Sequence, residues 1–321
     1  MGNGELSGGD KTWIVARGIR RPNETPSRLY LSGMKDKGRQ GIELAPGIVG
    51  LDRPPTELVW LQEARQNGAD LVGANIDVRT LRGAVNILGK KIDGRYTTRA
   101  VREAYSLWNR SQALDQYLRL FFMNSYSGIR FLDCLVGESP AASLEKDPAI
   151  RKGYIGYPFT WVCPNPYFKG YTEEFDDFRD VKAGSDGFSV GKLRIRTLGD
   201  APMTYPQVWL PGPGIWRIPR GLRQDDGSLP AYDPTDPETY VELPALKAGE
   251  QAWLDPNPRV ETIVNQTAAG TQTNLWAKMK GQRPKLHLPG STSEEWTFAV
   301  KGGSGSAKPK VVVQPLYLSY N

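Results

Sequence analysis

The segment Glu295-Trp-Thr-Phe-Ala-Val300 is typical of a β-strand, because Trp296, Phe298 and Val300 fall on one face of an extended chain. Alternation of large apolar residues with other residues is typical of a strand that buries one face. Comparable short stretches recur through the second half of the chain, separated by Gly, Pro and Asp turns. The strands predicted there are 188–198, 205–210, 214–219, 239–243, 250–254, 258–265, 284–288, 294–301 and 310–320.

Nine short strands at this spacing predict a β-sandwich or a jelly-roll-like fold for the second half. The segment Lys301-Gly-Gly-Ser-Gly-Ser-Ala307 stands between the last two predicted strands. Its small, polar composition predicts a flexible hairpin tip.

The first half is also rich in strand patterns, but it contains one helical stretch. Strands are predicted at 28–32, 57–61, 74–79 and 83–89, followed by a turn at Asp93-Gly94. Apolar residues then recur at three- and four-residue steps from about 98 to 121, which predicts an amphipathic helix with a kink or break near Asn109 and Ser111. The apolar positions of this helix are Val101, Tyr105, Trp108, Leu114, Leu118 and Phe121.

Two further strands close the first half and set a domain boundary. Segments 130–136 and 154–162 predict a long hairpin whose connection, 137–152, is a polar loop. The run Pro164-Asn-Pro-Tyr-Phe168 and the acidic stretch 173–180 then interrupt the strand pattern. We therefore predict a mainly β protein with two domains. Residues 1–167 form a β-sandwich-like domain with one helix, and residues 168–321 form a second β-sandwich.

Composition and charge narrow the class of protein. The chain has 321 residues, of which 39% are hydrophobic and 24% charged, so it can fill the cores of two globular domains. The net charge of +6 falls within residues 1–165, yet the basic residues are scattered in runs of at most two, which argues against specific nucleic-acid binding. No apolar run approaches the ~18 residues of a membrane span, and no signal peptide is expected.

The residues that usually carry chemistry form no recognisable constellation. The single histidine, His287, alternates with Leu286 and Leu288, which predicts a surface position. One histidine and two distant cysteines do not make a zinc site, and no Gly-x-Ser-x-Gly elbow is present. Gly83 to Lys90 has the wrong spacing for a phosphate loop, and Ser143-Leu-Glu-Lys146 lacks its partner motifs. We therefore predict no catalytic, cofactor-binding or metal-binding residue, and no enzyme.

Three groups of residues leave alternatives open. Acidic residues cluster at 173–180 and at Glu294 with Glu295, which suits either solvated loops and strand ends or a pair of glycosidase carboxylates. The tryptophans of the second half suit a core or interface better than sugar stacking; they are Trp209, Trp216, Trp253, Trp276 and Trp296. Cys134 and Cys163 are expected to be buried free thiols, and a bridge between them stays possible.

The order of several motifs resembles one protein family. Leu198-Gly-Asp-Ala-Pro-Met-Thr-Tyr-Pro-Gln-Val-Trp-Leu-Pro-Gly-Pro213 is followed by Ala248-Gly-Glu-Gln-Ala-Trp-Leu-Asp-Pro-Asn-Pro-Arg259 and then by Lys285-Leu-His-Leu-Pro-Gly-Ser291. This order resembles the distal tail protein, or minor tail protein, family of long-tailed actinobacteriophages. The resemblance covers nearly the whole chain and is weakest over the first ~50 residues.

The resemblance implies a structural role in the virion. It implies a ring, usually of six subunits, formed by the N-terminal domain, and a C-terminal domain that is often galectin-like. The implied partners are further copies of the chain, the tail tube protein, and the hub and fibre proteins of the tail tip, with assembly in the host bacterial cytoplasm. A carbohydrate-binding module on a particle or cell surface is the alternative function, with host cell-wall glycan as its ligand. A glycosidase built on the acidic clusters is a third hypothesis.

Overall fold

The computed structural model divides the chain into two compact units. It describes residues 13–18, 28–33, 37–62, 67–90, 97–112, 116–138, 153–279, 281–303 and 307–320. The first unit comprises Met1–Gly170 and Tyr317–Asn321, and the second comprises Tyr171–Leu316. The division follows the interruption after Pro164, but the last five residues belong to the first unit, which the sequence-based division does not include.

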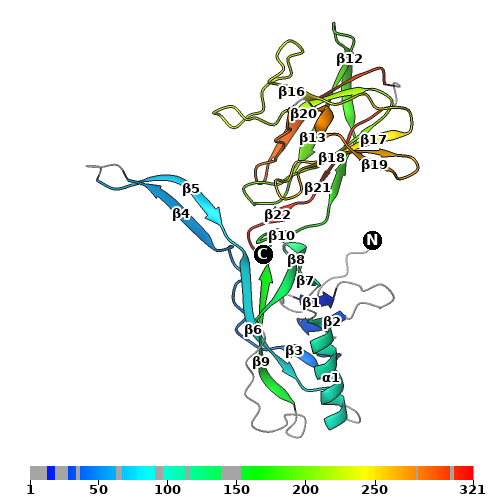
Figure 1. Cartoon of the computed structure of the whole chain (residues 1–321). Coiled ribbons are helices and arrows are strands. Elements are labelled where there is room, and N and C mark those ends of the chain that lie inside the picture. The colour runs from blue at the N-terminus through cyan, green and yellow to red at the C-terminus, as the bar shows by residue number, and fades with distance from the viewer. Residues whose placement is uncertain are drawn as a thin grey trace. The chain divides into compact units, whose positions relative to one another are not determined.

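The first unit is built on one nine-stranded sheet with the path β2-β1-β7-β8-β9-β6-β3 (Figure 1). Its ends lie near one another, because β2 contacts β3 and Gly38 N donates to Tyr30 O at 3.0 Å. The sheet is therefore nearly closed. Its strands are β1 (Trp13–Gly18), β2 (Arg28–Ser32), β3 (Ile42–Leu44), β6 (Arg79–Ile87), β7 (Leu118–Asn124), β8 (Gly128–Glu138) and β9 (Tyr154–Cys163), with β10 (Phe168–Lys169) and β22 (Leu316–Tyr317) off the path.

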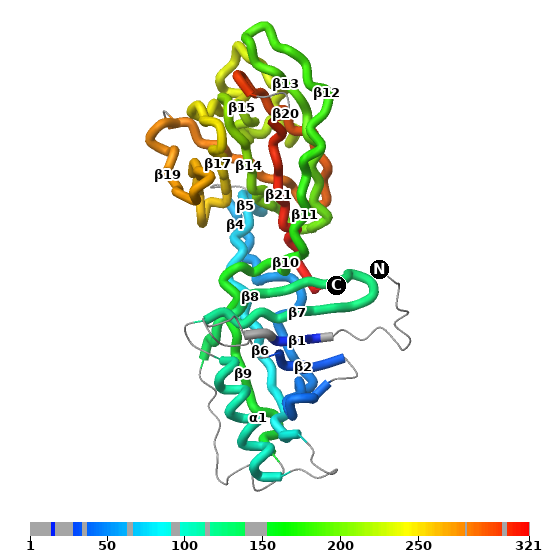
Figure 2. The backbone as a smooth tube through the Cα atoms, turned by 90° about the vertical axis from the view of Figure 1, so that its right-hand side faces the viewer, coloured from blue at the N-terminus to red at the C-terminus, as the bar shows by residue number. Residues whose placement is uncertain are grey.

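The helix α1 (Thr98–Ser111) covers part of this sheet and runs beside β9 and β6 (Figure 2). Thr97 caps it by accepting a hydrogen bond from Ala100 N at 3.2 Å. Trp108 is buried, and its ring lies 6.1 Å from Phe159 and 6.0 Å from Trp161. Aromatic packing thus fixes the helix on β9.

The predicted extension of the helix to residue 121 is wrong. The helix ends at Ser111, and Leu118–Asn124 forms strand β7. Leu118, Leu120 and Phe122 are buried at steps of two, and β7 pairs with both β1 and β8. Hydrogen bonding on both sides of this segment favours a strand over the weak three- and four-residue spacing. The predicted apolar position at 114 lies outside the described residues.

Other predictions for the first unit have mixed outcomes. The hairpin of 130–136 with 154–162 is confirmed, because β8 and β9 pair antiparallel with Leu135 opposite Val162. The predicted strand at 74–79 is instead the end of one strand and the start of another, with Val78 N donating to Asp77 Oδ1 at 2.6 Å between them. Residues 139–152 and the Asp93-Gly94 turn lie outside the described residues.

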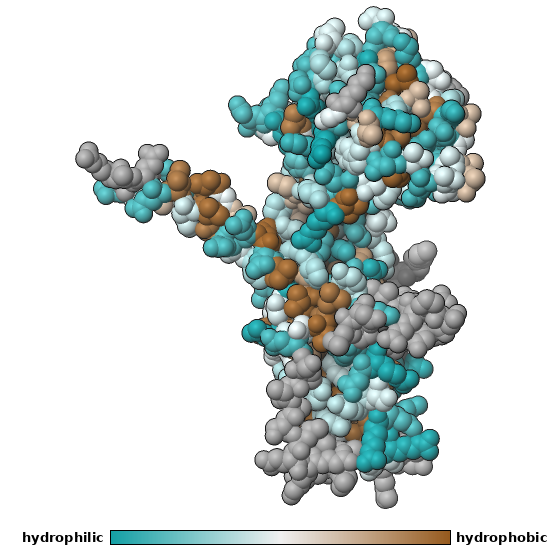
Figure 3. Space-filling model, in the orientation of Figure 1, coloured by the Kyte–Doolittle hydropathy of each residue, from teal (hydrophilic) through white to brown (hydrophobic). Residues whose placement is uncertain are grey.

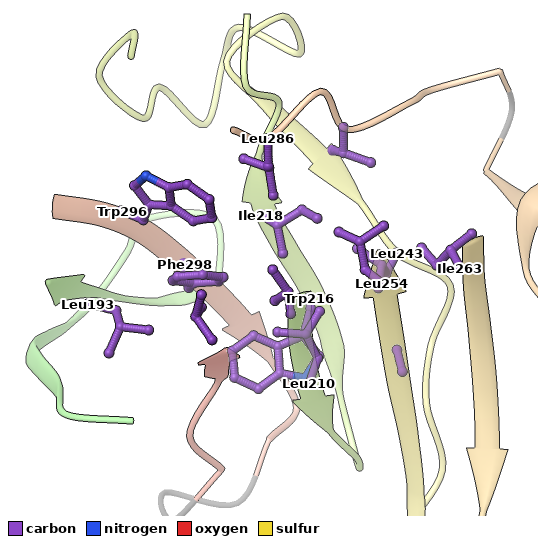
Figure 4. Packing of buried hydrophobic residues seen from close by; sticks show 14 of the residues in the cluster. Leu193, Leu210, Trp216, Ile218, Leu243, Leu254, Ile263, Leu286, Trp296 and Phe298 are labelled. Atoms are coloured by element: carbon purple, nitrogen blue, oxygen red, sulfur yellow. The ribbon is translucent and has the colours of Figure 1, made fainter. Parts of the chain in front are cut away.

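The second unit is a sandwich of two antiparallel sheets. Figure 4 shows that side chains from both sheets fill one core, with Trp216, Trp296 and Phe298 completely buried. The six-stranded sheet contains β11 (Glu173–Phe175), β21 (Lys310–Val313), β14 (Gln207–Pro211), β17 (Glu250–Asp255), β18 (Thr262–Thr267) and β19 (Gln272–Asn274). The five-stranded sheet contains β12 (Phe178–Ala183), β13 (Ser189–Arg196), β20 (Ser293–Lys301), β15 (Ile215–Pro219) and β16 (Tyr240–Glu242).

The predicted fold class is confirmed, namely a mainly β protein with one helical segment. Among the described residues α1 is the only α-helix, a short 3₁₀ helix follows at Trp276–Lys278, and no helix there is long and apolar enough to cross a membrane. The alternation predicted for 295–300 is confirmed, because Trp296, Phe298 and Val300 all belong to the core of the second unit.

Two predictions for the second unit are wrong. Strands β20 and β21 do not form a hairpin, because β20 pairs with β13 and β15 whereas β21 pairs with β11 and β14. The two strands therefore lie in different sheets, and residues 304–306 between them lie outside the described residues. Residues 284–288 make a single bridge, between Leu288 and Thr204, because Pro284 and Pro289 at its ends have no N–H to donate to a ladder.

Gly41, just before β3, lies close to the backbone of Gly89, just after β6. Its φ is +76°, and an added Cβ would lie 2.3 Å from the Gly89 carbonyl carbon. We expect Gly41→Ala to destabilise the first unit by roughly 2–4 kcal/mol, from backbone strain plus a backbone clash. Gly47→Ala is the matched control, since Gly47 has φ +96° with open space around it and should cost about 1–2 kcal/mol. Equal losses in chemical denaturation would contradict the close approach.

Asp133 on β8 ties three strands together and gives the first unit a pH dependence. Burial alone would raise the pKa of its carboxyl, but hydrogen bonds from Arg119 on β7 (2.6 Å) and Lys169 on β10 (2.9 Å) hold that pKa below its ordinary value. A carboxyl with a lowered folded-state pKa adds stability above its unfolded pKa of about 3.9, and that stability is lost as the pH falls through the folded-state pKa. We therefore expect Asp133→Asn to lower the melting temperature at pH 7 and to flatten its fall below about pH 4.

The control for this prediction is Glu57→Gln, which neutralises an exposed carboxylate of the same unit. Thermal melting followed between about pH 2 and pH 7 should show the flattened profile only in Asp133→Asn. A profile for Asp133→Asn that runs parallel to the wild-type profile would contradict the role of Asp133.

Candidate interaction surface

Strands β4 (Thr56–Leu61) and β5 (Asp70–Ile76) form a two-stranded sheet that pairs with no other described strand. We call these two strands the arm. The arm projects from the nine-stranded sheet of the first unit (Figure 1). In its register Leu58 lies opposite Ala74 and Trp60 opposite Leu71, with a bulge between Val59 and Trp60.

Among the described residues, the arm exposes more large apolar side chains than any other element. Trp60 is 56% exposed, Leu71 55% and Val72 63%. Leu58 and Trp60 share one face of β4, because alternate residues of a strand point the same way, and Glu57 lies on the other face. The bulge between Val59 and Trp60 then places Leu71 directly opposite Trp60. Figure 3 shows the apolar residues gathered along the arm.

An exposed apolar hairpin of this kind has a physical cost. A two-stranded sheet alone is marginally stable in water, and contiguous exposed apolar surface usually marks a contact with another molecule. Nothing among the described residues covers the apolar side chains, since Leu58 and Val59 are also 46% and 39% exposed. The arm is therefore the strongest candidate for an interaction surface.

Arg79, the first residue of β6, fixes the root of the arm. Its side chain is completely buried and donates to the carbonyl oxygens of Pro166 (2.6 Å), Gly50 (2.7 Å), Leu318 (2.7 Å) and Asp52. These carbonyls belong to three segments: the chain before β4, the end of the β9–β10 connection, and the C-terminal residues.

The surroundings of Arg79 explain how a charge is tolerated there. The guanidinium carbon lies 4.8 Å from the centroid of the Phe168 ring, which is also buried. Burial lowers the pKa of Arg79, and the nearby Cys163, Cys134 and Asp52 oppose that shift. Five N–H donors in a rigid fork suit an arginine, and not a lysine, to serve four carbonyls at once.

We expect Arg79→Met to destabilise the first unit by roughly 3–5 kcal/mol, because it leaves buried carbonyls without a charged donor. The matched control is Arg82→Met, which removes the same charge from an exposed position on the same strand and should change stability by less than about 0.5 kcal/mol. Chemical denaturation followed by tryptophan fluorescence measures both. Similar small losses in the two variants would contradict the role of Arg79.

His287 and Glu294 are both held by one arginine, Arg223. His287 is half-buried, so its predicted surface position is only partly right. Its Nε2 accepts from Arg223 Nε at 3.1 Å, and Arg223 also donates to Glu294 at 2.7 Å. The other ring nitrogen, Nδ1, lies 3.2 Å from the Lys285 carbonyl oxygen, so both nitrogens of the imidazole have a polar neighbour.

Four further residues of the acidic clusters meet basic partners; three lie on strands, and Asp177 lies just before β12. Glu173 and Glu174 belong to β11, where they pair with Arg196 and Lys310 at 3.5 Å each. Asp177 pairs with Arg179, and Glu295 with Lys192 at 3.1 Å. Within the part of the chain that the structure describes, no group of three or more His, Cys, Asp or Glu residues is placed to hold a metal ion.

The remaining candidate motifs are also accounted for. Gly83 to Ile87 is part of β6, so the stretch is a strand as predicted. Ser143 and Lys146 lie outside the described residues. Of the five tryptophans of the second unit, Trp216 and Trp296 are buried, and the half-buried Trp209 and Trp253 pair with each other at 5.8 Å. The half-buried Trp276 lies against Arg283 at 5.6 Å, so none of the five rings is fully exposed for a sugar.

Comparisons with known proteins decide the relationship. No family model matches the chain. Over 309 residues it is 24% identical to the minor tail protein Gp27 of Mycobacterium phage D29, covering 86% of this chain and 89% of the relative. The corresponding protein of Mycobacterium phage L5 is 23% identical with the same coverage. The chain is a homologue of these minor tail proteins.

Solved structures show that this minor tail protein homologue has the fold of a distal tail protein. Dit of phage SPP1, described as a paradigm of the hub adsorption apparatus in phages that infect Gram-positive bacteria, matches with a TM-score of 0.58 at 10% identity, over 95% of this chain and 99% of Dit. A chain of the phage P2 baseplate in its activated conformation matches with a TM-score of 0.52 at 8% identity, over 95% and 98%. The predicted family resemblance is confirmed.

The arm and Arg79 were not found by sequence reasoning. Leu58 and Trp60 sit at alternating positions within Glu57-Leu-Val-Trp-Leu61, which predicted a strand but not an uncovered one. The available signal was the run of consecutive apolar residues, Leu58–Leu61, in a segment where a half-buried strand would alternate apolar and polar residues. Arg79 gave no signal, because its four acceptors are backbone carbonyls.

Proposed function

We propose that this minor tail protein homologue is the distal tail hub of a phage, where copies of the chain form a closed ring, of six subunits, between the tail tube and the tail tip. The protein is a structural component of the virion and not an enzyme. Further tip proteins, fibres and the tube are its partners. The support is the sequence relationship over 86% of the chain, the Dit-like fold over 95% of it, and the exposed arm.

The arm is the observation that carries the proposal. A closed ring needs a heterologous interface, in which one surface of a subunit meets a different surface of the next. The arm supplies a projecting surface that its own unit leaves uncovered, with Leu58, Trp60 and Leu71 as apolar anchors. Large aromatic residues in such positions dominate interface energies. The arm is therefore proposed to contact the neighbouring copy.

The test is the oligomeric state of the purified full chain. We expect analytical ultracentrifugation and negative-stain images to show a single closed ring. We expect the double change Trp60→Ser with Leu71→Ser to weaken ring assembly at least ~30-fold, because an interface hot spot contributes about 2 kcal/mol or more. The variant should keep the wild-type circular dichroism spectrum, since both side chains are already exposed.

The control is Val260→Ser, which removes a 48% exposed apolar side chain from the second unit and should leave the ring intact. A wild-type chain that stays monomeric at high concentration would overturn the ring. A ring that survives the loss of both Trp60 and Leu71 would overturn the role of the arm.

A further inference from the structure

Cys134 on β8 and Cys163 on β9 form a completely buried pair of thiols that the proposed hub function does not use. Both residues have no exposed surface, and their sulfur atoms lie 2.6 Å apart. Both are free cysteines in this structure. We infer that the pair forms an intrachain disulfide after the virion leaves the host cytoplasm, with a low-molecular-weight disulfide as oxidant.

The register of the sheet allows this bond without rearrangement. Leu135 lies opposite Val162, so the next residues along the two antiparallel strands, Cys134 and Cys163, face each other. Facing residues in an antiparallel pair have Cα atoms about 4.5 or 5.5 Å apart, and disulfides span about 4.4–6.8 Å between Cα atoms. The two strands therefore already hold the cysteines at bonding distance.

The position of the pair gives the bond a structural consequence. β8 and β9 join the two halves of the nine-stranded sheet, β2-β1-β7-β8 and β9-β6-β3. Their ladder is short and irregular, with a bulge between Val136 and Glu138. Cys134 and Cys163 stand at the end of that ladder, so a covalent bond there fastens the two halves of the sheet.

The chemistry balances by thiol–disulfide exchange. The thiolate of one cysteine attacks a sulfur of the oxidant and expels the first small thiolate, which leaves a mixed disulfide on the protein. The second cysteine attacks the protein-side sulfur and expels the second small thiolate. Two protein thiols are oxidised to one disulfide, the oxidant is reduced to two small thiols, and the two cysteine protons pass to them.

The surroundings of the pair make this reaction slow in the folded protein. Burial raises the pKa of the Cys134 thiol, and only the thiolate is nucleophilic. The neighbouring guanidinium of Arg79, opposite Cys163 in the β6–β9 ladder, opposes this rise in the pKa of Cys134. Cytosolic thiols stay reduced while virion surfaces meet oxidising conditions, so the timing of the bond rests on the tail-tip location.

The experiment uses the full-length chain with oxidised glutathione at about pH 8, near the ordinary pKa of a thiol. Intact-mass spectrometry should show the loss of two hydrogen atoms per chain, at a rate that rises in low urea as the site opens. The melting temperature should rise by roughly 5–10 °C and return on reduction. Cys163→Ser should instead give a single glutathione adduct and no rise.

Two outcomes would overturn the inference. The first is a wild-type chain that keeps both thiols, or links them only between chains, after oxidation in urea. The second concerns released particles: alkylation in denaturant, which exposes the buried residues, should label both cysteines only after reduction, and labelling before reduction contradicts the bond. Neither readout depends on ring formation, so the chain can fail this test and still be a ring hub.

Discussion

The first unit depends on one buried guanidinium. Arg79 binds four carbonyl oxygens from three segments that are distant in sequence, and it lies against the buried ring of Phe168. A buried charge without these acceptors would cost several kcal/mol of stability, so the guanidinium can be buried only because the four carbonyl oxygens accept from it. The root of the arm, the exit from β9 and the C-terminal residues are held by this single side chain.

The arm and its root have opposite physical characters. At the root four N–H groups of the guanidinium donate to backbone carbonyls, which holds these segments together. A few residues away, Trp60 and Leu71 lie in water although their chemistry favours burial. A rigid base that carries an exposed apolar surface is preorganised for contact, because little conformational entropy is lost when a partner covers it. This combination suits a subunit of a larger assembly.

The second unit shows how residues that suggest chemistry can be fully occupied by structure. His287 and Glu294 meet on Arg223, and Arg217 lies 3.8 Å over the Phe188 ring while it donates to Asp186 at 2.5 Å and to Glu242 at 2.8 Å. Each arginine joins side chains that come from different strands and loops of the second unit. Three of the acidic residues that raised the glycosidase hypothesis, Glu173, Glu174 and Glu295, each pair with a basic side chain.

Sequence patterns predict the mainly β class, the burial of Trp296 and Phe298, the β8–β9 hairpin and the resemblance to phage minor tail proteins, because each of these depends on local alternation or on the order of motifs. The folded chain is needed to show that 118–124 is a strand, that β20 and β21 lie in different sheets, and that the arm is uncovered. These features depend on which strand lies beside which, and hydrogen bonds between strands join residues far apart in the chain. The contacts of Arg79 and of the paired thiols are also invisible in the sequence, because any residue can supply a backbone carbonyl and the pairing of strands is set by the fold.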